Sequence, residues 1–412
     1  MSLASSGRLA AAVIGGLLLS LPPVFAQGLD AVGSDAVIRI PATITSMAGY
    51  ATRMISYRDQ NHSWQTTDGA IHLVVNLGPP GLTLYSSFNS GATWTAMFTL
   101  ANTDGNSTDD GVLTTTATGA SLQLMYATGT GTIAYSTATY DSAAQSWTLA
   151  STQTAYSAAG IIATNPAFAS DSAGNLWCGF TAENNATQEY QEDMIYQLAG
   201  STDWLDTGLI FGQVDNTTQH SARPVAYAGG IGVLYEDEAA LYWAYRLNSF
   251  ALDAPWVSTM MYADLPPESS DPYDTHYSVV ADSADNLYLA FIGNPANLIF
   301  TIFSSSANAW GPLQLLGKST AASAYPEVSI ADGNLLLMAN HVTDVEVLQS
   351  RNFGKSFRET QLLTHPRVTN GVSYNKPRVE TPRYSTSPVP VFQQFVDGSE
   401  DELMFFQVPV IN

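Results

Sequence analysis

Polar and titratable residues recur at one position in this sequence, directly before a series of apolar segments. Arg223 comes before the segment 224–227, and His276 comes before 277–280. The other positions of this kind are Asn165, Tyr325 and Lys376, with Asn61 or His62, and Asp110, in two looser segments. Arginine is suited to gripping a carboxylate or sulfate, and histidine carries protons near neutral pH. Together these residue types could bind and transform an acidic substrate.

Further groups lie close to these positions in the chain. Tyr277 directly follows His276, and Arg378 lies two residues after Lys376. The loops after the second predicted strand of each unit add Glu183, Glu236, Asp237 and His341. His220 lies three residues before Arg223. If the fold gathers these side chains at one end, we expect a binding pocket there. The alternative is an ordinary structural role, because junctions between loops and strands are commonly polar.

The charge balance limits the partners of the protein. The chain has 36 acidic and 14 basic residues. Such a surface repels nucleic acid and anionic lipid head groups and favours solubility. Cations are so sparse that each one in a concave site would stand out. We therefore expect no nucleic-acid partner.

A repeat of roughly fifty residues must position these groups. An aromatic residue that closes a polar turn recurs at Trp94, Trp147, Trp204, Trp256, Trp310 and Phe357, with gaps of 53, 57, 52, 54 and 47 residues. A turn followed by an apolar strand keeps step with it, for example before 70–77, 120–127 and 286–292. Each unit reads as about four short strands, and no stretch has a helical period. Units of this kind are typical of β-propeller blades.

The two ends of the chain set the number of blades. After the sixth unit, the segments 374–382, 389–396 and 401–410 supply three strands, while AVIRIPATI at 36–44 has no partner of its own. A last blade closed by this N-terminal strand would hide two sheet edges at once. We therefore predict an all-β propeller of seven four-stranded blades, with six blades as the alternative.

Two turns resemble the Asp-box, S-x-D-x-G-x-T-W, of the bacterial neuraminidase repeat in sialidase-like propellers. Both carry Asn where that family has Asp. Like Asp, Asn can form hydrogen bonds with the backbone of its own turn. The matching residues are Ser87, Asn89, Gly91 and Trp94 in the first unit, and Ser350, Asn352, Gly354 and Phe357 in the sixth. The resemblance implies a propeller that acts on or binds glycans. It places these turns at the blade periphery, so it concerns fold and not chemistry.

A sialidase-like glycosidase is the first functional hypothesis. Ile38-Arg39-Ile40-Pro41 resembles the short motif whose arginine holds the substrate carboxylate in that family. The resemblance implies an arginine triad, for which the candidates are Arg39, Arg223 and Arg246, and a tyrosine nucleophile paired with a glutamate, here Tyr242 or Tyr325 with Glu236. The family's sialidases have six blades, and seven blades would make 36–44 an outer strand, far from the axis.

An eliminative lyase on a uronate-containing polysaccharide is the second hypothesis. Elimination needs a cation that neutralises the uronate, a base for the α-proton and an acid at the leaving oxygen. Arg223 or Lys376 could neutralise the carboxylate, and Tyr277 or Tyr325 could be the acid. The candidate bases are His220, His276 and His341. The residues His62, Asn165, Arg246, His341, Lys376 and Arg378 complete the predicted substrate site.

A non-catalytic carbohydrate-binding or interaction propeller is the third hypothesis. Trp177, Tyr242 and Trp243 could stack on sugar faces, although aromatic residues of this kind also pack blades together. In every case the expected partner is a glycan or acidic polysaccharide, bound by a monomer. No metal-binding spacing is evident, so neither a metal nor another cofactor is expected.

The N-terminus indicates export. Arg8, an apolar run at 9–21 and Val24-Phe25-Ala26 predict a signal peptide over 1–26, with cleavage near Ala26. The rest, 27–412, would form a single propeller domain, secreted to the extracellular space or periplasm. No later stretch is long and apolar enough for a membrane span. Cys178 is the only cysteine, so no intramolecular disulfide can form and the packed core must provide the stability.

Overall fold

The computed structural model describes residues 36–38, 54–55, 59–76, 78, 81–214, 222–227, 229–237, 240–250, 254–263, 276–293, 297–318, 326–340, 344–364, 378–397 and 400–411. Met1–Asp30 is a unit separate from Ala31–Asn412 and lies outside these residues, as does the predicted signal peptide. All of the described secondary structure of Ala31–Asn412 is β-strand, in seven sheets.

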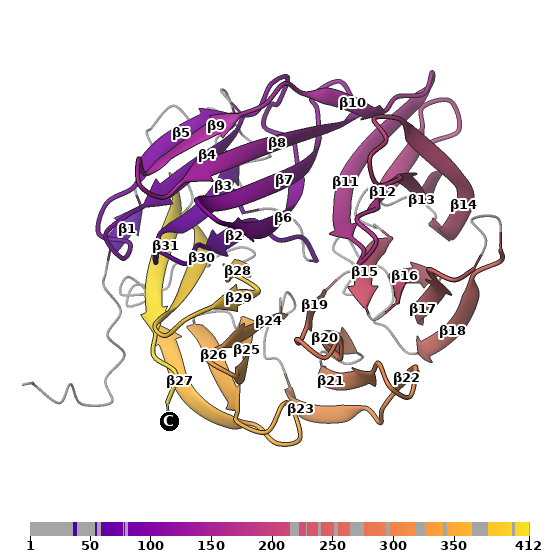
Figure 1. Ribbon diagram of the computed structural model, residues 1–412. Coiled ribbons are helices and arrows are strands. Elements are labelled where there is room, and N and C mark those ends of the chain that lie inside the picture. The colour runs from indigo at the N-terminus through magenta and orange to yellow at the C-terminus, as the bar shows by residue number, and fades with distance from the viewer. Residues whose placement is uncertain are drawn as a thin grey trace, which may run out of the picture. The chain divides into compact units, whose positions relative to one another are not determined.

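The seven sheets are the blades of a β-propeller, arranged around a central axis (Figure 1). This confirms the seven-bladed prediction over the six-bladed alternative. The strands that start each blade at the axis are β2 (Ser63–Gln65), β6 (Asp109–Thr116), β11 (Ile161–Ser170), β15 (Arg223–Tyr227), β19 (Tyr277–Ala281), β24 (Pro326–Ala331) and β28 (Arg378–Glu380). The second strands are β3 (Ile71–Asn76), β7 (Gly119–Ala127), β12 (Leu176–Asn184), β16 (Gly230–Asp237), β20 (Leu287–Gly293), β25 (Asn334–Asn340) and β30 (Val389–Asp397).

Neighbouring strands within each blade pair antiparallel in chain order. The third strands are β4 (Leu82–Ser87), β8 (Ile133–Asp141), β13 (Tyr190–Gln197), β17 (Ala240–Leu247), β21 (Asn297–Ser304), β26 (Asp344–Ser350) and β31 (Glu400–Val408). The outer strands are β5 (Thr95–Thr99), β9 (Ser146–Leu149) with β10 (Gln153–Tyr156), β14 (Trp204–Val214), β18 (Val257–Tyr262), β22 (Ala309–Trp310) with β23 (Gln314–Lys318), and β27 (Arg358–Thr364). One short strand, β29 (Tyr384–Ser385), pairs in parallel with β24.

The seventh blade is completed from the N-terminal side of the chain, as predicted. Its strands run in the order β28-β30-β31-β1, and β1 (Ala36–Ile38) pairs antiparallel with β31. Val37 is the register partner of Met404. The N-terminal segment is therefore the outermost strand of the blade (Figure 1). Arg39, which follows it, lies outside the described residues.

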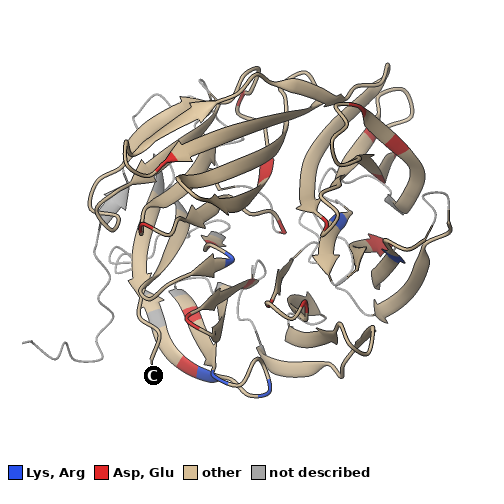
Figure 2. Cartoon of the chain, viewed as in Figure 1, with Lys and Arg blue, Asp and Glu red and all other residues tan. Residues whose placement is uncertain are grey.

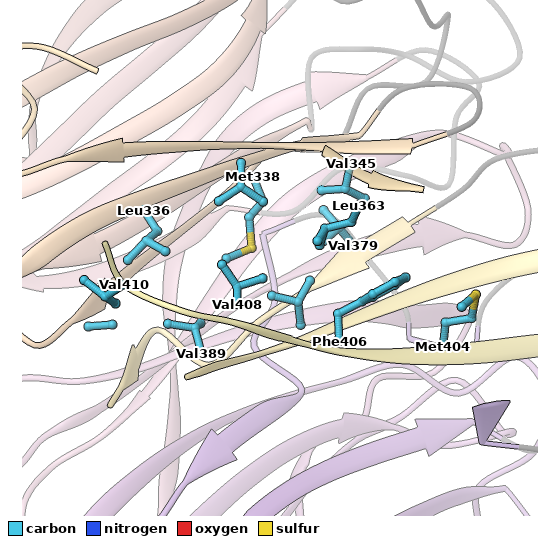
Figure 3. Packing of buried hydrophobic residues seen from close by; sticks show 13 residues of the cluster. Leu336, Met338, Val345, Leu363, Val379, Val389, Met404, Phe406, Val408 and Val410 are labelled. Atoms are coloured by element: carbon cyan, nitrogen blue, oxygen red, sulfur yellow. The ribbon is translucent and has the colours of Figure 1, made fainter. Parts of the chain in front are cut away.

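Apolar clusters between neighbouring blades hold the ring together. The second strands are buried on both faces, as in β3 and β20, because each blade is covered by a blade on either side. Figure 3 shows the cluster between the sixth and seventh blades, where Met338 and Leu363 pack with Val389 and Phe406. A corresponding cluster joins Leu73 of the first blade to Phe392 and Phe405 of the seventh. The apolar packing is thus continuous across the point of closure.

The two turns that resemble an Asp-box fold in the same way. In each, the serine hydroxyl accepts a hydrogen bond from the glycine N–H at 2.8 Å, for the pairs Ser87–Gly91 and Ser350–Gly354. The asparagine Oδ1 accepts the backbone N–H four residues on, for Asn89 at 2.9 Å and for Asn352 at 3.0 Å. Trp94 and Phe357 then pack against aromatic residues of the preceding blade. Asparagine thus forms the turn that the sequence led us to expect of it.

Gly91 offers a test of this packing, because it has a φ of 85° and a Cβ there would overlap the Phe405 ring. We expect Gly91→Ala to lower the free energy of unfolding by about 2–3 kcal/mol, through strain at positive φ and overpacking. Gly200→Ala is the matched control, since Gly200 has a φ of 79° and no neighbour within 4 Å of its Cβ position. Its loss should be about 1 kcal/mol. Equal losses in urea denaturation would contradict the contact with Phe405.

Candidate functional site

Asp110 joins four blades near the start of their inner strands. Its carboxylate forms a buried ion pair with the guanidinium of Arg223, on β15. It also accepts hydrogen bonds from the backbone N–H of Asn61, at 2.7 Å, and from that of Phe168, on β11. Asp110 and Arg223 are 0% and 1% exposed. The structure therefore brings together Asn61, Asp110 and Arg223, three of the positions that the repeat placed in a ring.

Asp59 and Tyr277 form a second pair at this end of the axis. The Tyr277 hydroxyl donates to Asp59 Oδ2 at 3.3 Å, and Arg383 Nη2 donates to the Asp59 backbone carbonyl at 3.0 Å. Burial raises the pKa of Asp59, and the Asp110 charge adds to this, against the opposing effect of Arg223 and Arg383. Burial and the charge of Asp59 raise the pKa of Tyr277 well above its usual value. Tyr277 therefore keeps its proton.

Two buried glutamates lie on the neighbouring inner strands. Glu380 accepts hydrogen bonds from the Ser63 hydroxyl at 2.8 Å and from the His62 N–H at 3.2 Å. Glu327 accepts one from the Ser278 hydroxyl at 3.0 Å. Burial is the main cause that raises the pKa of both carboxyl groups, and the charge of Glu380 raises that of Glu327 further. Burial therefore shifts both groups toward the protonated form, because low polarity disfavours their charge.

His62 faces a carboxylate of the second blade. Its Nδ1 lies 3.3 Å from Asp109 Oδ1. Burial lowers the pKa of His62, but Asp109, Glu380 and Asp110 outweigh it, so that the pKa is raised. Burial raises the pKa of Asp109, against the effect of His62. We call the set Asp59, His62, Asp109, Asp110, Arg223, Tyr277, Glu327, Glu380 and Arg383 the axial cluster.

Two cavities lie beside the inner strands. One of about 310 Å³ is lined by residues of β2 and β6, including Trp64 and Thr115, and one of about 160 Å³ by residues of β11, β15 and β19, including Arg223. Arg383 and Tyr384 line both. Figure 2 shows how few Lys and Arg positions the described chain has, some of them on strands near the axis. Two arginines on one small cavity are therefore notable.

The segment Thr381–Ser387, which carries Arg383 and Tyr384, is fixed by three other blades. The Tyr384 hydroxyl donates to the carbonyl of Ala281 at 3.0 Å. The backbone N–H of Thr386 donates to Gln65 Oε1, and that of Ser387 donates to Asp332 Oδ2, both at 2.8 Å. β29 adds its pairing with β24. Contacts with other blades, and not pairing within the seventh blade, therefore position Arg383.

The other predicted site residues are spread more widely. Asn165 lies in a β11 bulge with a φ of 53°, and its Nδ2 donates to Thr181 Oγ1 at 3.4 Å. His276 is buried directly before β19. Glu236 is buried near the end of β16, on the side where β15 starts. His220, Tyr325, His341 and Lys376, with the side chain of Arg378, lie outside the described residues.

Arg246 lies away from the axial cluster. It pairs with Ile231, close to the turn between β15 and β16, whereas Arg223 pairs with Leu234 at the other end of the blade. Tyr242 stacks on Tyr235, and Trp243 packs against Trp310. The structure therefore does not place Arg246 beside Arg223, because a third strand runs back to the opposite end of its blade.

Several members of the axial cluster were missed from the sequence. Asp59, Asp109, Glu327 and Glu380 lie within a few residues of the predicted ring positions, on the same inner strands or just before them. A wider window at each strand start could have found them. Arg383 gave no such signal, since it follows β28 in a segment that no other blade has.

The described residues hold no group of three or more His, Cys, Asp or Glu side chains arranged for a metal ion. No helix among the described residues is long and apolar enough to cross a membrane.

Comparisons with known proteins found similarity to solved structures only. No protein-family model matches the chain, and no curated protein matches it. A polysaccharide lyase described as an ulvan lyase of family PL25 is 10% identical with a TM-score of 0.48, covering 87% of this chain and 96% of its own. The Aleuria aurantia lectin, in complex with α-methyl-L-fucoside, is 10% identical with a TM-score of 0.48, covering 74% and 94%.

A third similar structure is a prolyl endopeptidase, 11% identical with a TM-score of 0.44, covering 90% of this chain. The chain spans about half the length of that protein, 52%. All of these similarities concern the fold alone.

The buried carboxyl groups predict how stability depends on pH. The folded state holds the Glu327 proton more tightly than the unfolded chain does, so the wild type loses stability as the pH rises above 4.5, the ordinary pKa of glutamate. In Glu327→Gln the amide oxygen can still accept the Ser278 bond. We therefore expect this variant to gain about 1–3 kcal/mol over the wild type between pH 4 and pH 8, measured by urea denaturation.

Glu189→Gln is the control for the loss of one carboxyl group, because Glu189 is exposed and its carboxylate accepts a hydrogen bond from the nearby Thr187 hydroxyl. Its difference from the wild type should stay constant over this range. A constant difference for Glu327→Gln as well would contradict a protonated Glu327.

Proposed function

We propose that the protein is an exported, carbohydrate-active propeller that binds an acidic polysaccharide at the axial cluster and cleaves it by elimination. The observation that carries this proposal is the Tyr277–Asp59 pair at 3.3 Å, next to two arginines that line a single cavity. These groups match the three requirements of elimination, which are a cation at the uronate, a base and an acid.

Arg223 and Arg383 supply the cations. A guanidinium can bind a carboxylate through two parallel hydrogen bonds, which draws charge from the uronate and makes its α-proton more acidic. Arg223 is already paired with Asp110, whereas Arg383 donates from Nη2 to the backbone carbonyl of Asp59. Arg383 therefore keeps more of its donors for a substrate, and Arg223 adds to the positive potential of the cavity.

Tyr277 supplies the acid. Its raised pKa disfavours the phenolate that a nucleophile would need, and it favours a phenol that donates its proton to the leaving oxygen. In the proposed step, a base removes the α-proton, the bond to the leaving oxygen breaks, and that oxygen takes the Tyr277 proton. His276, adjacent to Tyr277 in sequence, and Asp59, with its raised pKa, are the candidate bases. The proton then returns from the base to Tyr277.

The sialidase alternative is weaker. The sialidases that the sequence resembles have six blades, and this protein has seven. Arg246 is also at the far end of its blade from Arg223. Neither observation argues against elimination, which requires no arginine triad.

A panel of uronate-containing and sialylated glycans tests the proposal. We expect an ultraviolet absorbance from the unsaturated uronate product on at least one polyuronate. Release of sialic acid, or new reducing ends without that absorbance, would instead indicate hydrolysis. Binding without turnover would indicate a non-catalytic carbohydrate-binding protein. If the protein neither bound nor cleaved any glycan of the panel, a glycan function would be refuted.

Tyr277→Phe tests the proposed acid on any polyuronate that is cleaved. We expect kcat to fall by about 10²–10⁴, because the proton donor is lost while the ring stays. Tyr288→Phe is the matched control, since Tyr288 donates to the carboxylate of Asp282 at 2.7 Å on the same blade but lies outside the axial cluster. The control should keep its kcat. Equal effects of the two substitutions would reduce Tyr277 to a structural role.

A further inference from the structure

A pocket between the third and fourth blades is separate from the axial cluster. It has a volume of about 410 Å³. Its lining residues from the third blade are Trp177, Tyr196, Asp206, Thr207 and Leu209, and those from the fourth blade are Arg246, Ala254, Pro255 and Trp256. It lies near the turn between β15 and β16, at the opposite end of the blade from Arg223. A ligand here would not meet the axial cavities.

Aromatic rings form the walls of this pocket. Trp177 and Tyr196 stack with centroids 5.2 Å apart and planes at 23°, and Trp256 meets Trp177 edge-on at 6.0 Å. Trp177 is fixed by a hydrogen bond from its Nε1 to Asp171 Oδ2 at 3.0 Å. Tyr196 and Trp256 are only partly buried. Rigid aromatic surface that remains accessible is suited to the apolar C–H face of a sugar ring.

Polar groups also line this pocket. The Arg246 guanidinium carbon lies 5.8 Å from the Trp177 ring centroid, and its Nη2 donates to the Phe250 carbonyl at 2.8 Å. Asp206 is exposed on β14 and Thr207 follows it. A guanidinium donates to hydroxyl oxygens, and a carboxylate accepts from hydroxyl protons. The pocket therefore offers both kinds of partner that a sugar hydroxyl can use.

We propose that this pocket binds a neutral pyranose. One arginine and one aspartate line it, so their charges balance and no cation is left over for a uronate. Stacking on Trp256 would hold the apolar face of the sugar, and Arg246 and Asp206 would hold its hydroxyls. The pocket would thus anchor a neutral residue of a glycan, whether or not the axial cluster is catalytic.

Titration of the full-length protein with methyl glycosides of neutral hexoses tests this proposal, with methyl glucuronide as the acidic probe. We expect any glucuronide signal, which would come from the axial cluster, to be unchanged by Trp256→Ala, and isothermal titration calorimetry to detect at least one neutral glycoside. Trp256→Ala should weaken that binding at least tenfold, because it removes the stacking surface. Trp310→Ala is the matched control, since Trp310 holds the equivalent repeat position and, like Trp256, packs on aromatic residues, but it does not line this pocket.

Ala254→Leu guards against an effect of misfolding. It adds volume to the pocket and removes no hydrogen bond, so it should also weaken binding at least tenfold while the thermal unfolding midpoint stays close to that of the wild type. Tyr277→Phe should leave binding unchanged, which separates this site from the proposed reaction. The proposal is overturned if no neutral glycoside binds, if Trp256→Ala weakens glucuronide binding as much as neutral-glycoside binding, or if Trp256→Ala and Ala254→Leu bind like the wild type.

Discussion

Asp110 is the buried charge on which the axial end of the propeller depends. It pairs with Arg223 of the fourth blade and accepts backbone hydrogen bonds from Asn61, just before the inner strand of the first blade, and from Phe168, within that of the third. A carboxylate with no exposure is tolerated only when its lone pairs are satisfied in this way. Removing either partner of such a pair typically costs about 3–5 kcal/mol, because the other charge is left buried. The same ion pair that aligns four blades therefore also positions the guanidinium of Arg223 beside the axial cavity.

Apolar packing closes the ring, and the axial cluster depends on that closure. Each blade has two faces to bury, so every interface between blades has its own cluster, including the one that joins Phe392 and Phe405 to the first blade. β1 then completes the sheet of the seventh blade and covers its outer edge. Glu380 of this blade reaches Ser63 of the first. Closure thus brings the first and last inner strands, with their carboxyl groups, to the same side of the axis.

The fold was largely predictable from the sequence because its units repeat. The contacts of the site were not predictable in the same way, since they depart from the repeat. The phase of Trp94, Trp147 and the later aromatic residues gave the blades, and the unpaired segment 36–44 gave the closure. The ring position correctly singled out Arg223 and Asp110 as neighbours. It could not supply the partners of either residue, since side-chain direction depends on the bulges and offsets of each strand. Arg383 lies in an irregular segment after β28, which no repeat position predicts. Arg246 lies in the third strand of its blade, which returns to the end opposite Arg223, so it does not share the site.

The axial cluster combines five buried carboxyl groups with Arg223, Arg383 and His62. If all of them were ionised, the negative charges would exceed the positive ones in a region of low polarity. Burial is the largest cause that raises the pKa of Asp59, Asp109, Glu327 and Glu380, so it shifts these groups toward the protonated form and reduces the excess. An acidic ligand would add a further negative charge to the same region. Binding of such a ligand would therefore be linked to the protonation of these carboxyl groups. In the proposed function, protonated carboxyl groups would thus help Arg223 and Arg383 to accommodate a substrate anion.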